Sequence, residues 1–488
     1  MSISNRLADK TLLRQQCYID GQWVVADDGS DFPVINPADG TILGRVPNMG
    51  STETRRAIQA AHDAWIGWRN RTAKERAVIL RSWFELIMAN RDDLAIILTS
   101  EMGKALEEAK GEVTYAAAFV EWFAEEGRRT YGDVIPTHRA DNRILVIKQP
   151  IGVCAAITPW NFPSAMPTRK IAPALAAGCT MVLKPAGQTP LSALALMELA
   201  ERAGIPRGVL NVVTGDSAVI GRELSENLLV RKLTFTGSTE VGKLLMRQSS
   251  GTLKKISLEL GGHAPFLVFE DADLDAAIEG ALVAKYRSSG QTCVCANRIL
   301  VQDSIYDAFV HKFVSAVKPL TVGNGLDPAV KIGPLIDRAA QEKVEEHVRD
   351  AVSKGATLSL GGKPNSLGQT FFEPTILTDV TTDMLCMREE TFGPVAPVMR
   401  FRSEAEAISI ANDTPYGLAA YIYSRDLARV IRVSEALEYG MVGINTGLIS
   451  TEVAPFGGVK QSGIGREGSK YGIEEYLEIK YVCIGSLG

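Results

Sequence analysis

The sequence predicts an α/β protein built around doubly wound parallel sheets, and three observations support this fold class. Between residues 153 and 249, short apolar runs alternate with longer stretches that have the period of amphipathic helices. A second series of the same kind begins near residue 258. The length of 488 residues indicates two or three domains, because one hydrophobic core rarely grows beyond ~250–300 residues. Strands that alternate with helices form parallel sheets with right-handed crossovers.

The two ends of the chain have different patterns. Residues 51–132 show helical apolar spacing, with candidate N-caps at Ser51 and Thr72, and predict several consecutive helices. Residues 133–152 indicate a β-hairpin or an arm. The tail, 471–488, ends in a β-prone run whose edge a monomer would expose, so we expect it to pair with another subunit.

The alternating region predicts individual elements in a definite order. In the first series we expect strands in VCAAITPW, TMVLKP, VLNVVTG and VRKLTFTG. The accompanying helices are expected in AMPTRKIAPALAAG, TPLSALALMELAERAG and TEVGKLLMRQSSG. The second series contains PFLVFED, LDAAIEGALVAKYR, RILVQ and IYDAFVHKFVSAV, and a third follows in QEKVEEHVRDAVSKGATLSLGG.

Composition and charge argue against several classes of function. A net charge of −5 without any Lys/Arg block gives no basis for nucleic-acid binding. No apolar run approaches the ~20 residues of a membrane helix, and the first residues lack the apolar core of a signal peptide. Seven cysteines at irregular spacing favour a reducing, cytoplasmic location over a disulfide framework. The five histidines are not spaced as zinc ligands, so no metal site is predicted.

The stretch SGQTCVCANR, residues 289–298, contains the strongest candidate for chemistry. A free cysteine is most often a small buried hydrophobic residue, which is the interpretation for most cysteines of this chain. Cys293 differs because glycine and polar residues precede it, where a core strand would be apolar. A thiolate there would be a nucleophile if its surroundings lower its pKa from ~8.5.

Three further residues lie where ligands or acid–base groups are expected. Lys184 ends a predicted buried strand, and ligands of open α/β sheets bind at such carboxyl ends. Gly237 lies between a predicted strand and a helix whose free N–H groups suit a phosphate, although such turns are commonly structural. Glu259, flanked by leucines and two glycines in SLELGG, would be a partly buried general base of raised pKa.

Seven short motifs occur in order along the chain and resemble those of the aldehyde dehydrogenase superfamily. They are PWNFP (159–163), LKPA (183–186), FTGST (235–239), ELGG (259–262), GQTC (290–293), EETFGP (389–394) and PFGG (455–458). The nearest resemblance is to the succinate-semialdehyde dehydrogenase branch, through ITPWNFPSAM, GQTCVCANR and REGSKYGIEEYLEIKY. It implies an NAD(P)-dependent enzyme that oxidises the small-molecule substrate succinate semialdehyde to succinate.

The resemblance also implies a fold with a Rossmann-like cofactor domain, an α/β catalytic domain and a small β oligomerisation arm, assembled as a homodimer or homotetramer. The expected boundaries are 1–130 and 151–259 for the cofactor-binding domain, 260–445 for the catalytic domain, 131–150 and 470–488 for the arm, and 446–469 for a return segment that lines the substrate site.

By this resemblance Cys293 is the nucleophile. It would add to the aldehyde carbon to form a thiohemiacetal, and a thioester would remain after hydride transfer. The Asn161 side-chain amide and the Cys293 N–H would stabilise the oxyanion. Glu259 would activate the water that releases the acid.

The cofactor is expected to be NADP in preference to NAD. NAD-preferring relatives commonly have glutamate after KPA, whose carboxylate binds the ribose hydroxyls and repels a 2′-phosphate. Gly187 occupies that position here, and Lys184 offers a cation. The residues expected to hold the cofactor are Trp160 and Phe392 as walls, Lys184 and Glu390 as the ribose-holding pair, Gly237 and Ser238 beside the pyrophosphate, and Gly187.

The expected substrate carries an ω-carboxylate, and arginine holds a carboxylate by two parallel bonds. Arg169 and Arg287 match the two arginines of the branch, Arg287 on a helix aimed at the nucleophile, and Ser450 matches its hydroxyl contact. Pro167 departs from the common pattern, as does His263 in ELGGH, where the branch commonly has ELGGN. ELGGH also occurs in dehydrogenases of related half-aldehydes, so glutarate semialdehyde is the alternative substrate.

Cys295 is a candidate redox partner of the nucleophile. In an extended segment, residues i and i+2 lie ~6.6 Å apart, near the upper edge of the ~4.4–6.8 Å that a disulfide tolerates. A Cys293–Cys295 bond would switch the enzyme off reversibly under oxidation. The alternative is that Cys295 only packs beside the substrate.

Three other functions are weighed against this one: a non-catalytic binding protein of the same fold, a cysteine hydrolase, and an acylating dehydrogenase that uses coenzyme A. The presence of Cys293 and Glu259 argues against the first. A hydrolase would need a histidine near the thiol, and only His263 is near in sequence. Retention of Glu259 favours water over coenzyme A as the acceptor.

Overall fold

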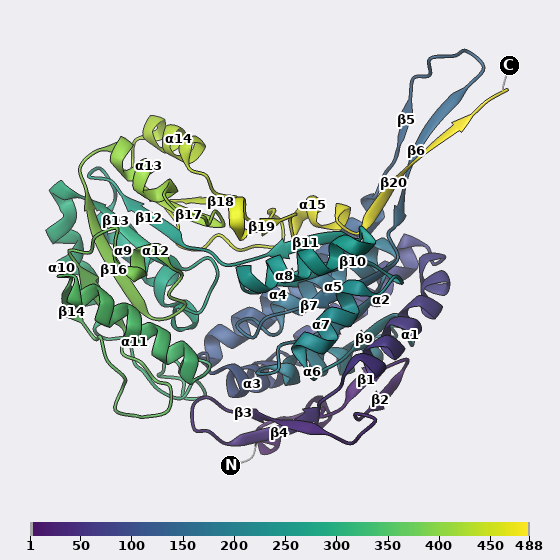
Figure 1. Cartoon of the computed structure of the whole chain (residues 1–488), viewed down its shortest axis with the longest axis horizontal. Helices are drawn as coiled ribbons and strands as arrows, with labels where there is room; N and C mark the ends of the chain where they lie inside the picture. Colours follow the sequence, from purple (N-terminus) through teal and green to yellow (C-terminus); the bar gives the residue numbers. More distant parts are fainter. Residues whose placement is uncertain (1–2, 487–488) are drawn as a thin grey trace.

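The computed structural model describes residues 3–486, which form two α/β lobes and a projecting arm (Figure 1). The first lobe contains an eight-stranded sheet in the order β19-β11-β10-β7-β8-β9-β1-β2. Its five central strands, β11 to β9 in that order, are parallel. The bounds of the eight strands are β1 Cys17–Ile19, β2 Gln22–Val24, β7 Val153–Ile157, β8 Thr180–Lys184, β9 Leu210–Val212, β10 Val230–Thr236, β11 Lys255–Glu259 and β19 Gly463–Ile464.

Helices cover both faces of this sheet, as the doubly wound prediction requires. One face carries α1 (Ser51–Arg69), α7 (Ser217–Glu226) and α8 (Thr239–Ser249). The other carries α2 (Ala73–Ala89), α3 (Arg91–Met102), α4 (Leu106–Glu126), α5 (Ala165–Ala177) and α6 (Pro190–Arg202). Along β8, Val182 belongs to the hydrophobic cluster on the face covered by α1, α7 and α8, while Met181 and Leu183 belong to the cluster on the opposite face. This alternation is that of a strand buried on both sides.

The second lobe repeats the pattern around a seven-stranded sheet in the order β14-β15-β16-β13-β12-β17-β18, parallel except for the β14–β15 pair. Its strands are β12 Ala264–Val268, β13 Ala296–Gln302, β14 Thr357–Leu360, β15 Thr375–Thr378, β16 Val395–Phe401, β17 Ala419–Tyr423 and β18 Met441–Ile444. Its helices are α9 Leu274–Tyr286, α10 Tyr306–Val317, α11 Arg338–Ser353, α12 Leu385–Arg388, α13 Glu404–Asn412 and α14 Leu427–Ala436. Among residues 3–486, no helix is both long and apolar enough to cross a membrane.

The fold class and the order of the predicted elements are confirmed, with three corrections. Helix α7, between β9 and β10, was not predicted because Gly221 and polar residues interrupt its apolar pattern. The N-cap of α1 is Gly50 and not Ser51, because the Glu53 carboxylate accepts the Gly50 N–H at 3.0 Å. Thr72 caps α2 as predicted, in a reciprocal pair with Glu75.

The third correction concerns the return segment, which adds the short strand β19 to the edge of the first sheet beside β11. Apart from β19, the last strand in the chain that belongs to the first sheet is β11, which ends at Glu259. The first strand of the second sheet is β12, which begins at Ala264. The predicted domain boundary after residue 259 remains a prediction that agrees with this division of the strands.

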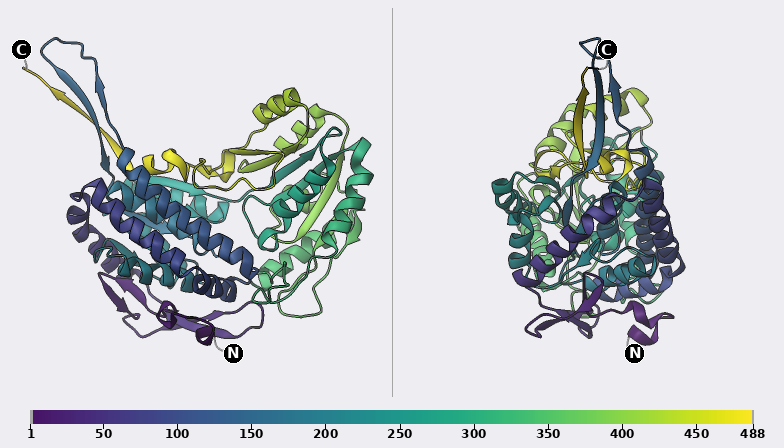
Figure 2. Two further views of the ribbon diagram at one scale, coloured as in Figure 1. Left: turned by 180° about the vertical axis from the view of Figure 1, so that it is seen from behind. Right: turned by 90° about the vertical axis from the view of Figure 1, so that its right-hand side faces the viewer.

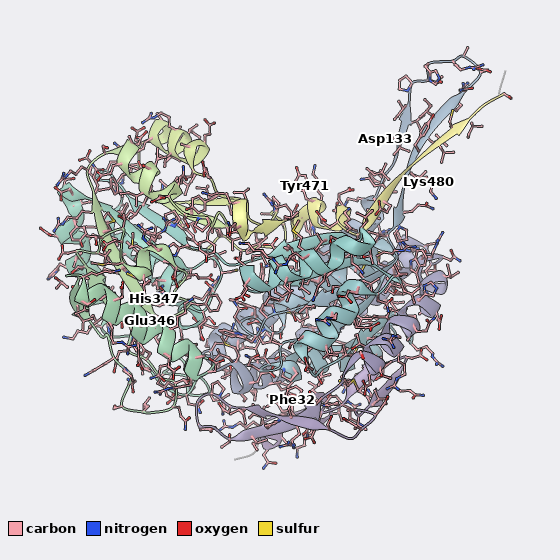
Figure 3. The ribbon with its side chains drawn as sticks, in the orientation of Figure 1. Phe32, Asp133, Glu346, His347, Tyr471 and Lys480 are labelled. Carbon is pink, nitrogen blue, oxygen red and sulfur yellow. The ribbon has the colours of Figure 1, made fainter. Side chains whose placement is uncertain are left out.

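The arm is a three-stranded antiparallel sheet of β5 (Asp133–Ile135), β6 (Arg143–Pro150) and β20 (Leu477–Ile484). It extends away from both lobes in every view (Figure 2), and Asp133 and Lys480 mark its two outer strands (Figure 3). Val134 and Ile479 are 77% and 70% exposed. Two open strand edges with exposed apolar side chains favour pairing with another chain.

We expect the arm to mediate self-association. A Val134→Lys/Ile479→Lys variant should have a lower molar mass than the wild type by size-exclusion chromatography with light scattering, because charge opposes burial of these side chains. Leu367→Lys is the control, since Leu367 is 57% exposed in a loop outside the arm. A wild type that runs as a single 52.7-kDa chain would contradict the expectation.

Candidate active site

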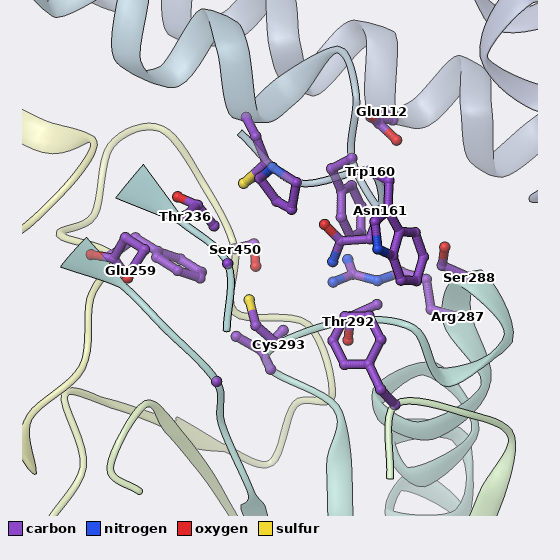
Figure 4. Close-up of a pocket in the computed structure, with 18 of the residues that line it drawn as sticks. Glu112, Trp160, Asn161, Thr236, Glu259, Arg287, Ser288, Thr292, Cys293 and Ser450 are labelled. Atoms are coloured by element: carbon purple, nitrogen blue, oxygen red, sulfur yellow. The ribbon is translucent and has the colours of Figure 1, made fainter. Parts of the chain in front are cut away.

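A cavity of about 520 Å³ brings together most of the predicted site residues from distant parts of the chain (Figure 4). Its wall contains the predicted catalytic residues, and also Trp160, Arg169, Gly237, Ser238, Arg287, Glu390, Phe392 and Ser450. In the view of Figure 4, the Cys293 thiol lies between Glu259 on one side and Asn161 and Arg287 on the other. Lys184, Gly187 and Cys295 are not part of this wall.

Glycines of three motifs allow this convergence, because each lies against another motif with no room for a side chain. A Cβ on Gly262 would lie 2.2 Å from the Cys293 carbonyl oxygen. On Gly290 it would lie 2.2 Å from the carbonyl oxygen of Gly393, and on Gly457 it would lie 2.7 Å from the Gly465 carbonyl oxygen and 2.8 Å from the Glu259 carboxylate. Glycine is needed where two backbones approach this closely.

Cys293 lies in a turn before β13, and the prediction of an extended segment here was wrong. The Cys295 N–H donates to the Thr292 carbonyl oxygen at 3.1 Å, which closes the turn. Cys295 is fully buried, and its thiol contacts the Lys285 ammonium at 3.3 Å and the Lys285 carbonyl oxygen at 3.4 Å. Both cysteines are free thiols, and the role of Cys295 as a redox partner remains a prediction.

Asn161 is fixed from two directions in the loop after β7. Its side-chain NH₂ donates to the Gln291 carbonyl oxygen at 3.1 Å, next to the nucleophile segment. Its own carbonyl oxygen accepts from Lys104 at 2.7 Å, and Lys104 is ion-paired with Glu112 at 2.6 Å. Both members of this pair are buried. Among the described residues the second N–H of this amide has no acceptor, so it is available to a ligand of the cavity that Asn161 lines.

Glu259 ends β11 and carries its carboxylate into a buried, charged environment. Burial, reinforced by the nearby negative charge of Glu467, raises the pKa of Glu259 well above its usual value, while Arg169 and Lys170 oppose this shift. One oxygen of the carboxylate has no hydrogen-bond partner among the described residues. A carboxyl group of raised pKa is suited to take a proton near neutral pH.

The two predicted substrate arginines differ in their partners. Arg169, in α5, is 2% exposed, pairs with Glu467 at 2.5 Å and stacks on Phe456 at 4.0 Å. Arg287 forms no ion pair with any described residue, and its guanidinium lies 5.6 Å from the Phe162 ring centre. The prediction that Arg287 lies on a helix needs correction, because it is the C-cap that follows α9.

Sequence reasoning missed Lys170 and Glu467. Lys170 is fully buried, contacts Glu467 and donates to the Thr236 hydroxyl at 2.6 Å. A signal existed in the sequence: two adjacent cations, Arg169 and Lys170, interrupt an otherwise apolar helix and therefore require a buried anion. Nothing in the local sequence indicated that this anion comes from residue 467.

The residues predicted to hold a dinucleotide form a suitable donor set. Gly237 leads into α8, whose N-cap Ser238 accepts from the Val241 N–H, so free N–H groups point toward the loop. The rings of Trp160 and Phe392 lie 5.5 Å apart in the cavity wall. A Cβ on Gly187 would meet only Phe32, at 3.6 Å, which leaves room beside the end of β8.

Of the predicted Lys184–Glu390 pair, only Glu390 lines the cavity, and each side chain has its own hydrogen-bond partner. The Lys184 ammonium donates to the Pro185 carbonyl oxygen at 3.2 Å, and burial lowers its pKa to about 8. Glu390 accepts the Gly262 N–H at 3.0 Å, and burial raises its pKa to about 7. Their role as the pair that holds the ribose remains a prediction.

His263 does not line the cavity. Its ring is buried, and neither nitrogen has a hydrogen-bond partner among the described residues. Burial, together with the nearby Arg298, lowers its pKa well below the usual value. A neutral, buried imidazole gives no support to a role in proton movement or to the hydrolase alternative. Within residues 3–486, no group of acidic, cysteine and histidine side chains is arranged to hold a metal ion.

Comparisons with known proteins agree with this arrangement. The family model of the aldehyde dehydrogenase family matches residues 23–482. A glutarate-semialdehyde dehydrogenase of Pseudomonas aeruginosa is 66% identical over 99% of this chain and 100% of its own. An NADP(+) succinate-semialdehyde dehydrogenase of Escherichia coli is 64% identical over 98% and 100%. The crystal structure of an Escherichia coli NADP-dependent enzyme, 64% identical, superimposes with a TM-score of 0.98 over 98% of this chain and 100% of that chain. The chain is an oxidoreductase that belongs to the aldehyde dehydrogenase family.

Proposed function

We propose that this enzyme oxidises a dicarboxylic half-aldehyde, succinate semialdehyde, to the dicarboxylic acid and uses NADP in preference to NAD. The observation that carries the proposal is the Arg287 guanidinium, which has no ion-pair partner within residues 3–486 and lies in the wall of the cavity that holds the Cys293 thiol. A cation in a cavity with 520 Å³ of space favours a small anionic ligand, because leaving it unpaired is costly. The names of the two relatives described above are consistent with this substrate class.

Each residue of the site has a distinct part in the proposed reaction. Once its proton has been removed, the Cys293 thiolate adds to the aldehyde carbon, and the Asn161 amide with the Cys293 N–H donates to the resulting oxyanion. The dinucleotide, when bound, supplies the acceptor for the substrate's hydride. Glu259 then takes a proton from the water that attacks the thioester. Arg287 and the Ser450 hydroxyl would hold the far carboxylate and so orient the aldehyde toward the thiol.

A glutarate half-aldehyde is the second candidate, because the Pseudomonas aeruginosa relative of that name is 66% identical to this chain. The two substrates differ by one methylene, which a pocket discriminates by only ~1–3 kcal/mol. Values of kcat/KM for four- and five-carbon semialdehydes decide between them.

The thiol should need activation. Burial raises the pKa of Cys293 to about 12, with Arg169 opposing the shift and Glu390 and Glu259 adding to it. Below its pKa a thiol gains thiolate about tenfold per pH unit, so alkylation of Cys293 by iodoacetamide should accelerate about tenfold per unit between pH ~7 and ~9. Mass spectrometry of the Cys293 peptide measures the rate, with the exposed Cys483 as internal reference. A plateau from pH ~7 would mean a preformed thiolate.

The covalent mechanism predicts two different failures. Cys293→Ala should abolish oxidation and leave cofactor affinity near normal, because no thiohemiacetal can form. Glu259→Gln should release one equivalent of reduced cofactor per site and then stall, since the thioester is not hydrolysed. Stopped-flow absorbance at ~340 nm distinguishes them. Loss of the burst in Glu259→Gln would mean that Glu259 also activates the thiol.

The NADP preference is proposed to depend on the missing carboxylate at Gly187. Because a Cβ there meets only Phe32, at 3.6 Å, Gly187→Glu should fold normally. Its carboxylate should repel the 2′-phosphate and shift the NAD/NADP ratio of kcat/KM toward NAD by at least about tenfold. Gly187→Gln is the uncharged control. A wild type with equal kcat/KM for NAD and NADP would contradict the proposal. Equal NAD/NADP ratios in Gly187→Glu and Gly187→Gln would contradict it too.

Arg287→Leu tests the substrate class. It should cost the semialdehyde roughly 2–4 kcal/mol in kcat/KM, the scale of a charge-assisted bidentate contact, and leave butanal little affected. Arg169→Leu is the matched comparison and should impair both substrates, because it leaves Glu467 buried beside Lys170 with one cation fewer. Equal losses for both aldehydes in Arg287→Leu would make Arg287 structural and reopen the substrate class.

A further inference from the structure

The turn that follows Arg287 has an unfavourable backbone. Arg287 ends α9 with φ −54° and ψ 134°. Ser288, Ser289 and Gly290 then have φ of 53°, 57° and 75°. Two successive L-residues in the left-handed region are disfavoured, because Cβ crowds the following carbonyl oxygen. Such a segment persists only where its surroundings hold it.

Glu108, in the first turn of α4, holds this segment from the opposite lobe. The Ser288 N–H donates to both oxygens of the Glu108 carboxylate, at 3.0 and 3.2 Å. The Ser289 hydroxyl adds one bond of 2.9 Å to the Gly333 carbonyl oxygen. Glu108, Arg287 and Ser288 all line the cavity, and Figure 4 shows Arg287 and Ser288 together at the end of α9.

The charge of Glu108 does not by itself explain its contacts. Burial raises its pKa although Lys104, Arg287 and Lys331 favour its charged form, and a carboxylate near Arg287 competes with an anionic substrate for that cation. Glu108 also forms no ion pair with Arg287 among the described residues; its hydrogen bonds go to the neighbouring backbone N–H. The contact is therefore one that shapes the backbone.

Glu112, one helical turn further along α4, holds the other end of the site. Its carboxylate accepts the Ser164 N–H at 2.9 Å and pairs with Lys104, which holds the Asn161 carbonyl oxygen. Residues i and i+4 lie on the same helix face. One face of α4 thus fixes both the loop of the oxyanion donor and the turn of the substrate cation.

We propose that Glu108 is a positioning residue that places Arg287 at a set distance from Asn161 and Cys293, and so sets the chain length of the accepted half-aldehyde. This inference rests on the proposed function, in which Arg287 binds the substrate carboxylate. Holding the left-handed Ser288 by its N–H is the means by which α4 transmits its position to Arg287.

Glu108→Ala, Glu108→Gln and the control Glu107→Ala test this proposal. Glu107 is in the same turn of α4, and its side chain is 68% exposed and forms an ion pair with Lys110. Glu108→Ala should raise the KM for succinate semialdehyde about tenfold and change the KM for butanal less than about twofold. It should also bring the kcat/KM values of the four- and five-carbon semialdehydes closer together. Glu108→Gln keeps an acceptor oxygen and should stay near wild type, as should Glu107→Ala. A lowered KM in both Glu108 variants would show that Glu108 acts by charge, which overturns the proposal.

Ser288→Gly provides the rescue. Glycine adopts the left-handed region without steric cost, so in the Glu108→Ala background it should reverse most of the rise in KM. Peptide-level hydrogen–deuterium exchange over residues 287–295 measures, without substrate, how firmly Glu108 holds the Ser288 backbone. Exchange should be faster in Glu108→Ala than in Glu107→Ala. Unchanged exchange, or no rescue by Ser288→Gly, overturns the proposal.

Failure of the proposed function gives a different pattern. If Arg287→Leu impairs butanal and the semialdehyde equally, Arg287 does not bind the carboxylate, whatever the exchange data show. If Arg287→Leu is selective for the semialdehyde but Glu108→Ala is not, the substrate class stands and the positioning role of Glu108 is refuted.

Discussion

The corner between α3 and α4 is the point at which the two lobes meet the loop after β7 that carries Asn161. Gly103 ends α3 with φ 94°, and Lys104 follows with its ammonium on the Asn161 carbonyl oxygen. Cβ atoms on Gly325 and Gly333 of the second lobe would lie 2.3 and 2.0 Å from the carbonyl oxygens of Lys104 and Gly103. A side chain at Gly325 or Gly333 would collide with the backbone of this corner, which carries the Lys104 that holds Asn161. Neither glycine belongs to one of the seven motifs.

Buried ion pairs define the geometry of the cavity more than they stabilise the fold. The net gain from such a pair is small, whereas breaking one is costly, so it selects one arrangement over others. Lys104–Glu112 fixes the loop after β7, and Glu467 binds the return segment to α5 through Arg169 and Lys170. Together they hold the residues around the thiol from three segments far apart in sequence.

Burial also sets the ionisation of the reacting groups. The same exclusion of water raises the pKa of Cys293 to about 12 and raises the pKa of Glu259 well above its usual value. Because the thiolate is the reactive form of cysteine, a raised pKa makes the free thiol less reactive. Arg287 has no ion-pair partner in the part of the chain that the structure describes, and under the proposed function the substrate's carboxylate would pair with it.

Local sequence patterns determined the parallel α/β architecture, most elements and the identities of the motif residues, because strand and helix periodicities and glycine turns are short-range properties. Thr72 and β8 are predicted for this reason, and α7 was missed because its pattern is weak.

The tertiary structure alone decided which charges face each other. Arg169 and Arg287 look alike in the sequence, yet Glu467 pairs with the first and no described carboxylate pairs with the second. Likewise, the turn at Cys293 and the left-handed Ser288 follow from contacts with Gly262 and Glu108, which are 31 and 180 residues away in the chain. Long-range packing and desolvation act on three-dimensional neighbours, and a single sequence does not state which residues those neighbours are.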